Sequence, residues 1–299
     1  MAARKTVRIG VVVNRQKPGA RALLRDLLEY SHIHRDIEFL IEKDSAILLR
    51  QKGLPLAKLK DKVDLFLVAG GDGSLLEFVR ALYPAQVPTL GVNLGSLGFL
   101  TTLAQRELAG ALPLLARGQL RLSPRLALET IVHRRKKKEF YPCALNDVVV
   151  SRGGRSQLVR LRVHVGDVLV TEYVCDGLIV CTPTGSTAYS VSAGGPILSP
   201  DARVLALTPI CPHTLTNRSI VVGTDHPIRI EIPPQPSSLV LQFDGIPGGH
   251  LRAGDWIEIR PAPEPVVLAY TPETDFYSVL RQKLRWSGGS VPLHPPKCT

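Results

Sequence analysis

Short apolar runs alternate with amphipathic stretches through the first third of the chain. Val7–Val13 and Val63–Ala69 are apolar runs of strand length, and Ile37–Ile41 and Thr89–Asn93 are shorter strand candidates. Arg21–Tyr30 places its leucines on one face of a helix. Apolar strands separated by helices are typical of a parallel sheet that is covered by helices. The pattern therefore predicts an α/β domain over residues 1–120.

Near Leu120 the pattern changes to short strands separated by turns rich in proline and glycine. The strand candidates are Arg125–His133, Leu145–Ser151, Leu158–Val165, Val168–Val174, Leu178–Cys181, Val204–Thr208, Ser219–Val222, Ile228–Ile232, Leu239–Phe243 and Trp256–Ile259. Such a succession is typical of an all-β sandwich or stack of sheets. We therefore expect an α/β N-terminal domain with a parallel, Rossmann-like sheet and an all-β domain over residues 121–267. The C-terminal segment, residues 268–299, carries a helix at Phe276–Arg285 that we expect to pack back on the first domain.

Composition excludes several classes of protein. Hydrophobic residues make up 44% of the 299 residues, which is enough to form packed cores and excludes a disordered chain. Apolar runs are far shorter than the ~20 residues that a membrane-spanning helix needs, and Met1–Thr6 does not open a signal peptide. The five cysteines are scattered without a CxxC pair, so neither a disulfide framework nor a zinc site is predicted. These features predict a cytoplasmic protein with buried, reduced cysteines.

The net charge of +11 favours anionic partners, such as nucleic acid, anionic lipid or nucleotide phosphates, without choosing among them. The densest basic run is His133–Lys138, which is followed by Glu139. Aromatic residues that stack on bases do not interleave this run. We therefore interpret it as a solvated hairpin tip and expect no nucleic-acid partner.

A glycine-rich segment follows the apolar run Val63–Ala69. Gly70, Gly71 and Gly73 would let the backbone approach a phosphate at the edge of a parallel sheet. Asp72 in the middle of this segment would repel a bare phosphate, so we expect it to orient a hydroxyl group or to hold a divalent cation. Gly-Asp-Gly is also an ordinary turn sequence. The segment is neither a Walker P-loop nor a GxGxxG fingerprint.

Three further segments carry polar or aromatic groups next to predicted strands. Phe99 follows Thr89–Asn93 and could stack on a base or simply belong to the core. Asn146 and Asp147 open a valine-rich strand, where they suit an adenine edge and ribose hydroxyls, or form an Asx turn. The stretch Asp176–Pro196 concentrates hydroxyl groups and glycines around Tyr189, a density that a simple turn does not explain.

Taken together, GGDG at Gly70–Gly73, NLGSLGFL, LNDVVV, TPTGSTAY at Thr182–Tyr189 and PHTLTNR within Pro209–Val222 resemble the NAD kinase family. The resemblance extends from about Val7 to Leu284. GGDG is shared with diacylglycerol, sphingosine and phosphofructokinases, whereas TPTGSTAY and PHTLTNR are far more specific. The resemblance implies transfer of a phosphoryl group from ATP, or from polyphosphate in some members, to the 2′-hydroxyl of the adenosine ribose of NAD, with a divalent metal such as Mg²⁺.

The resemblance also assigns roles to residues. Asp72 matches the family's catalytic aspartate. Positions that contact NAD in the family correspond to Asp72, Gly73, Phe99, Asn146, Asp147, Asp176, Thr184, Thr187, Ala188, Tyr189 and Ser192. No further side chain is assigned as a metal ligand. Family members form homodimers or homotetramers whose sites borrow residues across an interface, so we expect the same of this chain.

Two positions depart from the family pattern. Asp147 stands where Glu is commoner, and Ile246 stands where many members have Gln, which puts a substrate contact there in doubt. Because a carboxylate is too weak a base to deprotonate a ribose hydroxyl fully before attack, we expect Asp72 to align the hydroxyl and accept its proton late. Organising a metal is the competing role for Asp72. The alternatives for the whole chain are a lipid or sugar kinase that shares GGDG, and a non-catalytic protein that binds nucleotides or nucleic acid.

Overall fold

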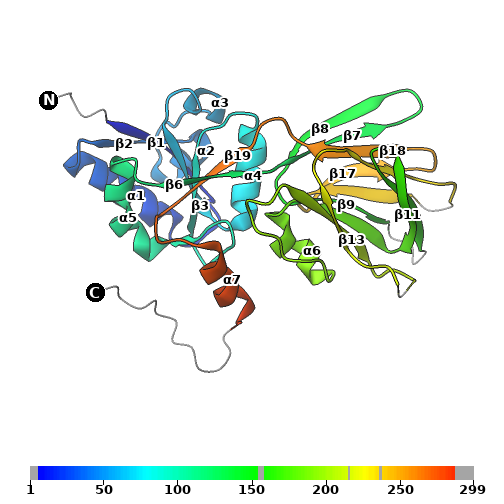
Figure 1. Cartoon of the computed structure of the whole chain (residues 1–299). Coiled ribbons are helices and arrows are strands. Elements are labelled where there is room, and N and C mark those ends of the chain that lie inside the picture. Colours follow the sequence, from blue (N-terminus) through cyan, green and yellow to red (C-terminus); the bar gives the residue numbers. More distant parts are fainter. Residues whose placement is uncertain (1–5, 154–157, 215, 236–237, 287–299) are drawn as a thin grey trace. The chain divides into compact units, whose positions relative to one another are not determined.

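The computed structural model describes residues 6–153, 158–214, 216–235 and 238–286, which divide into two compact units (Figure 1). Within the described ranges, the first unit, called here the α/β unit, comprises residues 6–75, 87–122 and 268–286. The second, the β unit, comprises Leu76–Gln86 and Ser123–Val267. Residues 76–86 therefore group with the β unit, whereas the sequence had placed them in the first domain. Of the C-terminal segment, the described residues 268–286 fall in the α/β unit.

The α/β unit is built on a sheet with the strand order β2-β1-β3-β4-β19-β6, and β5 pairs with β4. Strands β1 to β4 pair in parallel, as the apolar runs predicted. The strands are β1 (Val7–Val13), β2 (Ile37–Ile41), β3 (Leu65–Gly70), β4 (Thr89–Asn93), β5 (Leu103–Ala104), β6 (Arg121–Arg125) and β19 (Val266–Tyr270).

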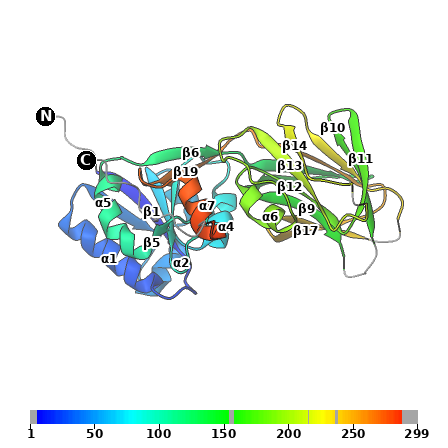
Figure 2. The same ribbon diagram turned by 60° about the horizontal axis from the view of Figure 1, so that its bottom comes forward.

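Helices pack on this sheet because their apolar side chains and those of its strands are buried together. Helices α1 (Ala20–Ile33) and α5 (Leu108–Ala116) lie beside the strands of this sheet (Figure 2). Leu23, Leu24 and Leu27 of α1 share one buried cluster with Leu112 and Leu115 of α5 and with residues of β1 to β4. Shorter helical segments are α2 (Lys43–Ala46) and α3 (Leu56–Leu59), with 3₁₀ turns at Ile47–Leu49 and Gln105–Glu107.

Two helices carry residues of the candidate site or contact its loop. Helix α4 (Asp72–Leu82) begins at Asp72, so the GGDG segment is the entry to a helix and not a free turn. The entry is tight, because a Cβ atom at Gly70 would lie 2.5 Å from the Ser74 hydroxyl oxygen. Helix α7 (Phe276–Leu284) begins as predicted, since Asp275 accepts hydrogen bonds from the backbone N–H groups of Tyr277 and Ser278, both at 2.9 Å.

The β unit is a sandwich of two sheets, with the strand orders β11-β10-β15-β18-β7-β8 and β14-β13-β12-β9-β16-β17. One cluster of buried apolar side chains contains residues of both sheets and forms the core. The first sheet contains β7 (Leu128–His133), β8 (Lys138–Ala144), β10 (Val159–Val165), β11 (Val168–Cys175), β15 (Ile228–Glu231) and β18 (Trp256–Pro261). The second contains β9 (Asp147–Arg152), β12 (Gly177–Cys181), β13 (Val204–Ile210), β14 (Ile220–Gly223), β16 (Leu239–Phe243) and β17 (Ile246–Leu251). A short helix, α6 (Tyr189–Ser192), follows a 3₁₀ turn at Gly185–Thr187.

The sequence prediction misplaced or missed several strands. The expected strand Arg125–His133 is divided between β6 and β7, and β8, β17 and β19 were not predicted. Strands β6, β8 and β17 contain proline or paired glycines and stand at the ends of their sheets' strand orders. Edge strands tolerate these residues because one side of the backbone needs no partner strand.

None of the helices in the described ranges is long and apolar enough to cross a membrane. Cys143, Cys175 and Cys181 are buried with free thiols, as predicted, whereas Cys211 is exposed. Cys298 lies outside the described residues.

Candidate active site

The carboxylate of Asp72, at the start of α4, accepts four hydrogen bonds from the loop that follows β4. Its Oδ1 atom accepts hydrogen bonds from the backbone N–H groups of Leu100 (3.1 Å) and Thr101 (2.9 Å) and from the Thr101 hydroxyl (2.9 Å). Its Oδ2 atom accepts one, from the backbone N–H of Phe99 (2.8 Å). Since each carboxylate oxygen has about two lone-pair sites, Oδ1 is saturated and Oδ2 can accept one more donor.

Gly98 makes this arrangement possible. A Cβ atom there would lie 2.0 Å from Asp72 Oδ1 and 2.5 Å from the Thr101 hydroxyl oxygen. The loop that follows β4 can therefore close over the carboxylate only if residue 98 has no side chain. The sequence indicated a glycine-rich loop here but not its contact with Asp72.

Phe99 lies on the same loop and is partly buried. The Lys283 ammonium group of α7 lies 5.7 Å from the centre of the Phe99 ring and donates a hydrogen bond to the Leu97 carbonyl oxygen (2.8 Å). The structure thus brings Asp72 and Phe99 together, and the C-terminal helix supports their loop through one cation.

In the β unit, the turn at Asn146 and the TPTGSTAY segment pack directly against each other. The backbone N–H of Thr182 donates to the Asn146 carbonyl oxygen (2.9 Å), and the Thr182 hydroxyl donates to the Leu145 carbonyl oxygen (2.6 Å). A Cβ atom at Gly185 would lie 2.0 Å from the Asn146 carbonyl oxygen, so glycine is needed at this contact.

Many hydroxyl groups of this loop are used within the protein. The Ser186 hydroxyl donates to the Pro183 carbonyl oxygen (2.6 Å), and the Ser190 hydroxyl pairs with that of Thr208 (3.0 Å). Thr184 is buried, whereas Thr187 and Ala188 are partly buried and Tyr189 and Ser192 are exposed. The loop therefore offers fewer hydroxyl groups to a ligand than its sequence suggests, and those of its second half are the accessible ones.

Asp176 is set apart from the other predicted residues of the β unit. It precedes β12, whereas Thr182 follows the same strand, so the two lie at opposite ends of a five-residue strand. Its carboxylate pairs with the Arg152 guanidinium at 3.2 Å. Within this unit, Asp176 does not join Asn146, Asp147 and the hydroxyl-rich loop.

Asp244, which was not among the predicted site residues, holds the turn at Asn146. Its carboxylate accepts hydrogen bonds from three consecutive backbone N–H groups, those of Leu145 (2.9 Å), Asn146 (2.7 Å) and Asp147 (3.1 Å). Asp244 has a positive φ of 47°. The Asp-Gly pair after β16 was the signal in the sequence, because Asp and Gly favour such turns.

The neighbouring carboxyl group of Asp147 is unusually easy to protonate. Burial, and then the negative charge of Asp244, raise the pKa of Asp147 to about 7. Burial also raises the pKa of Asp244, against the lowering effect of its three N–H donors and of Arg80. Among the residues that the structure describes, none donates a hydrogen bond to the Asp147 side chain.

The described part of the chain holds no cluster of three or more His, Cys, Asp or Glu side chains suited to a metal ion. This is compatible with Mg²⁺, which is commonly held by one or two carboxylates together with substrate phosphates. Asp72 Oδ2, with its open acceptor site, is one carboxylate oxygen that could take this role.

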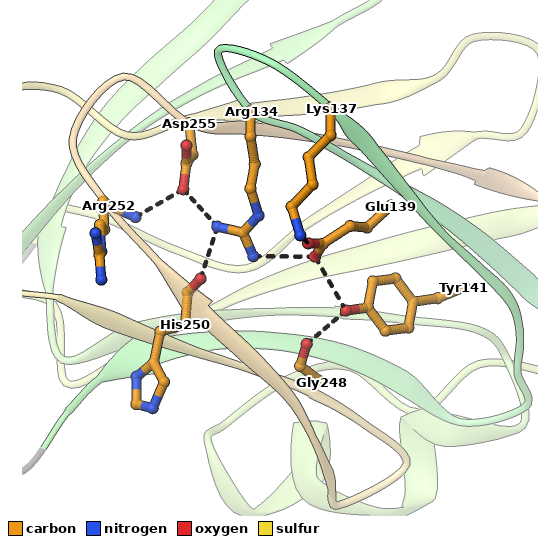
Figure 3. A network of polar contacts seen from close by, with 8 residues as sticks. All are labelled: Arg134, Lys137, Glu139, Tyr141, Gly248, His250, Arg252 and Asp255. Carbon is orange, nitrogen blue, oxygen red and sulfur yellow. Dashed lines mark hydrogen bonds and ion pairs between the residues drawn. The ribbon is translucent and has the colours of Figure 1, made fainter.

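The basic run His133–Lys138 forms a hairpin tip between β7 and β8, as predicted. Arg134, however, folds back to donate hydrogen bonds to Glu139 (3.0 Å), Asp255 (2.8 Å) and the His250 carbonyl oxygen (2.9 Å), as Figure 3 shows. The Tyr141 hydroxyl continues this network to the Gly248 carbonyl oxygen (2.6 Å). Arg134 thus ties the hairpin to β17 and to the turn before β18, which is a structural role.

Comparisons with known proteins agree with the motifs. The model of the ATP-NAD kinase N-terminal domain matches residues 29–120, and that of the ATP-NAD kinase C-terminal domain matches residues 145–271. A NAD kinase of Moorella thermoacetica is 42% identical over 98% of this chain and 94% of its own length. One from Syntrophotalea carbinolica is 40% identical over 93% of this chain and 98% of its own.

A solved structure gives the same result at the level of the fold. The yeast NADH kinase, crystallised in complex with NADH, aligns with a TM-score of 0.86 and 25% identity, covering 98% of this chain and 91% of its own. Two family models that together cover most of the chain, and relatives about 40% identical over nearly all of it, place this chain in the NAD kinase family.

Proposed function

We propose that this NAD kinase transfers the terminal phosphoryl group of ATP, or of polyphosphate, to the 2′-hydroxyl of the adenosine ribose of NAD, and that Asp72 carries the reaction. The observation that supports this role is the unequal use of the carboxylate's two oxygens. Three donors from the loop hold Oδ1 in place, while Oδ2 keeps one acceptor site for a substrate hydroxyl.

Such a carboxylate suits phosphoryl transfer, which depends mainly on positioning and on charge neutralisation around a loose transition state. Oδ2 would align the ribose hydroxyl for attack on the terminal phosphorus. As the new O–P bond forms, the hydroxyl becomes more acidic and its proton moves to Oδ2. The fixed position of the carboxylate means that little reorganisation accompanies this step.

We assign residues of each unit to the adenosine part of NAD. In the α/β unit they are Gly73 and the Phe99 ring, and in the β unit they are Asn146 and Asp147. Tyr189 offers an exposed ring for stacking, since 46% of the residue is accessible. The same set would admit NADH, because the two forms differ only in the nicotinamide ring.

A divalent cation, Mg²⁺ by preference, would neutralise charge on the donor's phosphates when it is bound. In that case Asp72 would help to hold it through Oδ2, which competes with the role of Asp72 as proton acceptor. Gly71 and Gly73 leave room for phosphates at the start of α4, because a Cβ atom at either position would meet nothing within 4 Å.

The test is NADP formation by the purified chain, with ATP and then with polyphosphate, each with and without Mg²⁺. NADH and diacylglycerol serve as alternative acceptors. The variant Asp72→Asn keeps the shape but removes the charge, and we expect kcat to fall by about 100-fold or more. Turnover near the wild-type value with NAD still bound would exclude Asp72 as the catalytic group. Asp255→Asn, in the Arg134 network, is the matched control for replacing a hydrogen-bonded carboxylate.

We also propose that the enzyme is a homodimer or homotetramer in which Asp176 serves a neighbouring subunit. Two observations support this. Asp176 lies at the opposite end of β12 from the hydroxyl-rich loop. Strand β11 also exposes consecutive apolar side chains at Val168, Leu169 and Val170, with 70%, 54% and 37% of each residue accessible.

Complementation tests this arrangement. Asp72→Asn and Asp176→Ala would each be inactive alone, but mixed oligomers would contain some sites with both intact residues. We expect activity to return on mixing after dissociation and reassociation, up to about a quarter of the wild-type value if subunits pair at random and each site draws on two of them. Sedimentation gives the oligomeric state. A monomer with full activity would contradict the proposal.

A further inference from the structure

The contacts around Asp244 form a closed set within the β unit. The backbone N–H groups of Leu145, Asn146 and Asp147 all point at its carboxylate, and the backbone N–H of Asp244 donates in return to the Asp147 carbonyl oxygen (3.0 Å). The Asp244 side chain is only 1% exposed. A buried carboxylate with several N–H donors fixes the backbone that supplies them, because leaving it unpaired would be costly.

Arg80 completes this arrangement from another element. It lies on the second half of α4, which belongs to the β unit, and one of its guanidinium nitrogens is 3.7 Å from Asp244 Oδ2. Its side chain is 26% exposed. The cation offsets the charge of Asp244, which would otherwise have only neutral N–H donors around it.

Asp244 is unsuited to contact the substrate itself. Both of its oxygens accept hydrogen bonds from the turn, and the side chain is almost inaccessible. Its effect on the reaction must therefore pass through the turn. The side chains of Asn146 and Asp147 project from the backbone that Asp244 holds, so their positions depend on it.

We propose that Arg80 and Asp244 form a positioning pair for the substrate-binding turn Leu145–Asp147 and thereby set how tightly the adenosine part of NAD binds. The inference rests on the proposed function, because it assigns the turn to NAD. Asp244 is a positioning residue and Arg80 its counter-ion; neither contacts the reacting atoms.

The pair also influences the ionisation of Asp147. The charged or titratable groups around the two carboxyl groups are Arg80 of α4, Cys143 of β8 and Cys181 of β12. Between the two carboxyl groups themselves, the negative charge of Asp244 adds to burial in raising the pKa of Asp147, whereas Arg80 lowers the pKa of Asp244. Neutralising Asp244 should therefore lower the pKa of Asp147.

The experiment compares Asp244→Asn, Arg80→Gln and Arg80→Lys with two controls, Asp255→Asn and Arg134→Gln, which alter a partly buried Arg–Asp pair in the same unit. We expect Asp244→Asn to lower kcat/KM for NAD by about 10- to 100-fold, because the turn is displaced. KM should change more than kcat. The acid limb of the kcat/KM profile should move to lower pH.

Arg80→Gln should raise KM for NAD. Arg80→Lys should return KM to within about threefold of wild type, because a single contact at this distance does not need the guanidinium fork. Both controls should keep the wild-type KM and pH profile.

Amide hydrogen exchange provides a measurement that does not depend on catalysis. Exchange at residues 145–147 should accelerate in Asp244→Asn and stay unchanged in Asp255→Asn. If the wild-type chain formed no NADP, the proposed function would fail, and calorimetric NAD affinity would replace KM in this test. Two results would each show that the positioning role is wrong. One is an Asp244→Asn variant with both a wild-type KM (or NAD affinity) and a wild-type acid limb. The other is unchanged hydrogen exchange at the turn.

Discussion

Replacing Gly98 by alanine tests the close contact between the loop that follows β4 and the Oδ1 atom of Asp72. The added Cβ would lie 2.0 Å from Asp72 Oδ1, whereas real Cβ atoms essentially never approach other atoms closer than 3.0 Å. The carboxylate or the loop must therefore move by about 1 Å (3.0 − 2.0), which breaks some of the three hydrogen bonds to Oδ1. Gly98 has no positive φ, so the effect comes from this contact and not from backbone strain.

A displacement of this size should lower kcat by about 100-fold. Forcing a methyl group into the contact should also cost about 1–3 kcal/mol of unfolding free energy. The matched control is Gly95→Ala in the same loop, where the nearest contact of the new Cβ is an ordinary 3.8 Å and φ is again not positive. That variant should keep its activity and gain up to about 1 kcal/mol from the stiffer unfolded chain.

The assays are NADP formation at saturating NAD and ATP, and urea unfolding of both variants. The contact argument fails if Gly98→Ala turns over within about twofold of Gly95→Ala, a difference too small for a displaced carboxylate. Loss of stability with normal kcat would mean that the loop can move without carrying Asp72 with it.

Three further outcomes are expected. Tyr189→Ala and Asn146→Ala should raise KM for NAD more than they lower kcat, and an unchanged KM in both would remove these residues from the site. Asp147→Asn should stabilise the fold at pH 8. The pKa of Asp147 is about 7 in the folded protein and 3.8 in the unfolded chain. The wild-type free energy of unfolding therefore falls as pH rises from about 4 to 7, by at most about 4 kcal/mol. The gain in melting temperature should vanish near pH 4, and a gain independent of pH would contradict the assignment. Arg134→Gln should destabilise the fold by about 1–3 kcal/mol without changing kcat. Because Arg134 and Lys137 lower the pKa of Glu139 from 4.5 to about 2, this difference should shrink as pH falls below 4.5, and a constant difference in urea unfolding would refute it.

Local patterns predicted most of the regular elements. The strand Leu239–Phe243 was placed at its observed bounds, and the α7 prediction, Phe276–Arg285, ends one residue beyond the helix. These segments were predictable because burial of one face or of both faces imposes a periodicity on the chain. The strands β8 and β17 were not, because an edge strand needs neither a continuous apolar run nor a full set of backbone donors.

The candidate site divides in the same way. Residue types and spacing identified Asp72, Asn146 and the TPTGSTAY segment, because phosphate and ribose chemistry needs glycines, carboxylates and hydroxyl groups in short loops. The internal use of Ser186 and Ser190, the isolation of Asp176 from the loop and the central position of Asp244 were not visible. Each depends on partners distant in the sequence, such as Thr208 for Ser190.

By itself, then, the sequence determined the two types of unit, the chemistry and the family, because short motifs record what a ligand requires locally. Only the tertiary structure decided which of the polar groups are free to meet that ligand. A carboxylate's role depends on its donors: Asp72 keeps one open acceptor site, whereas both oxygens of Asp244 are turned to the backbone. Those donors come from residues 27 to 99 positions away along the chain, and folding alone brings them within hydrogen-bond distance.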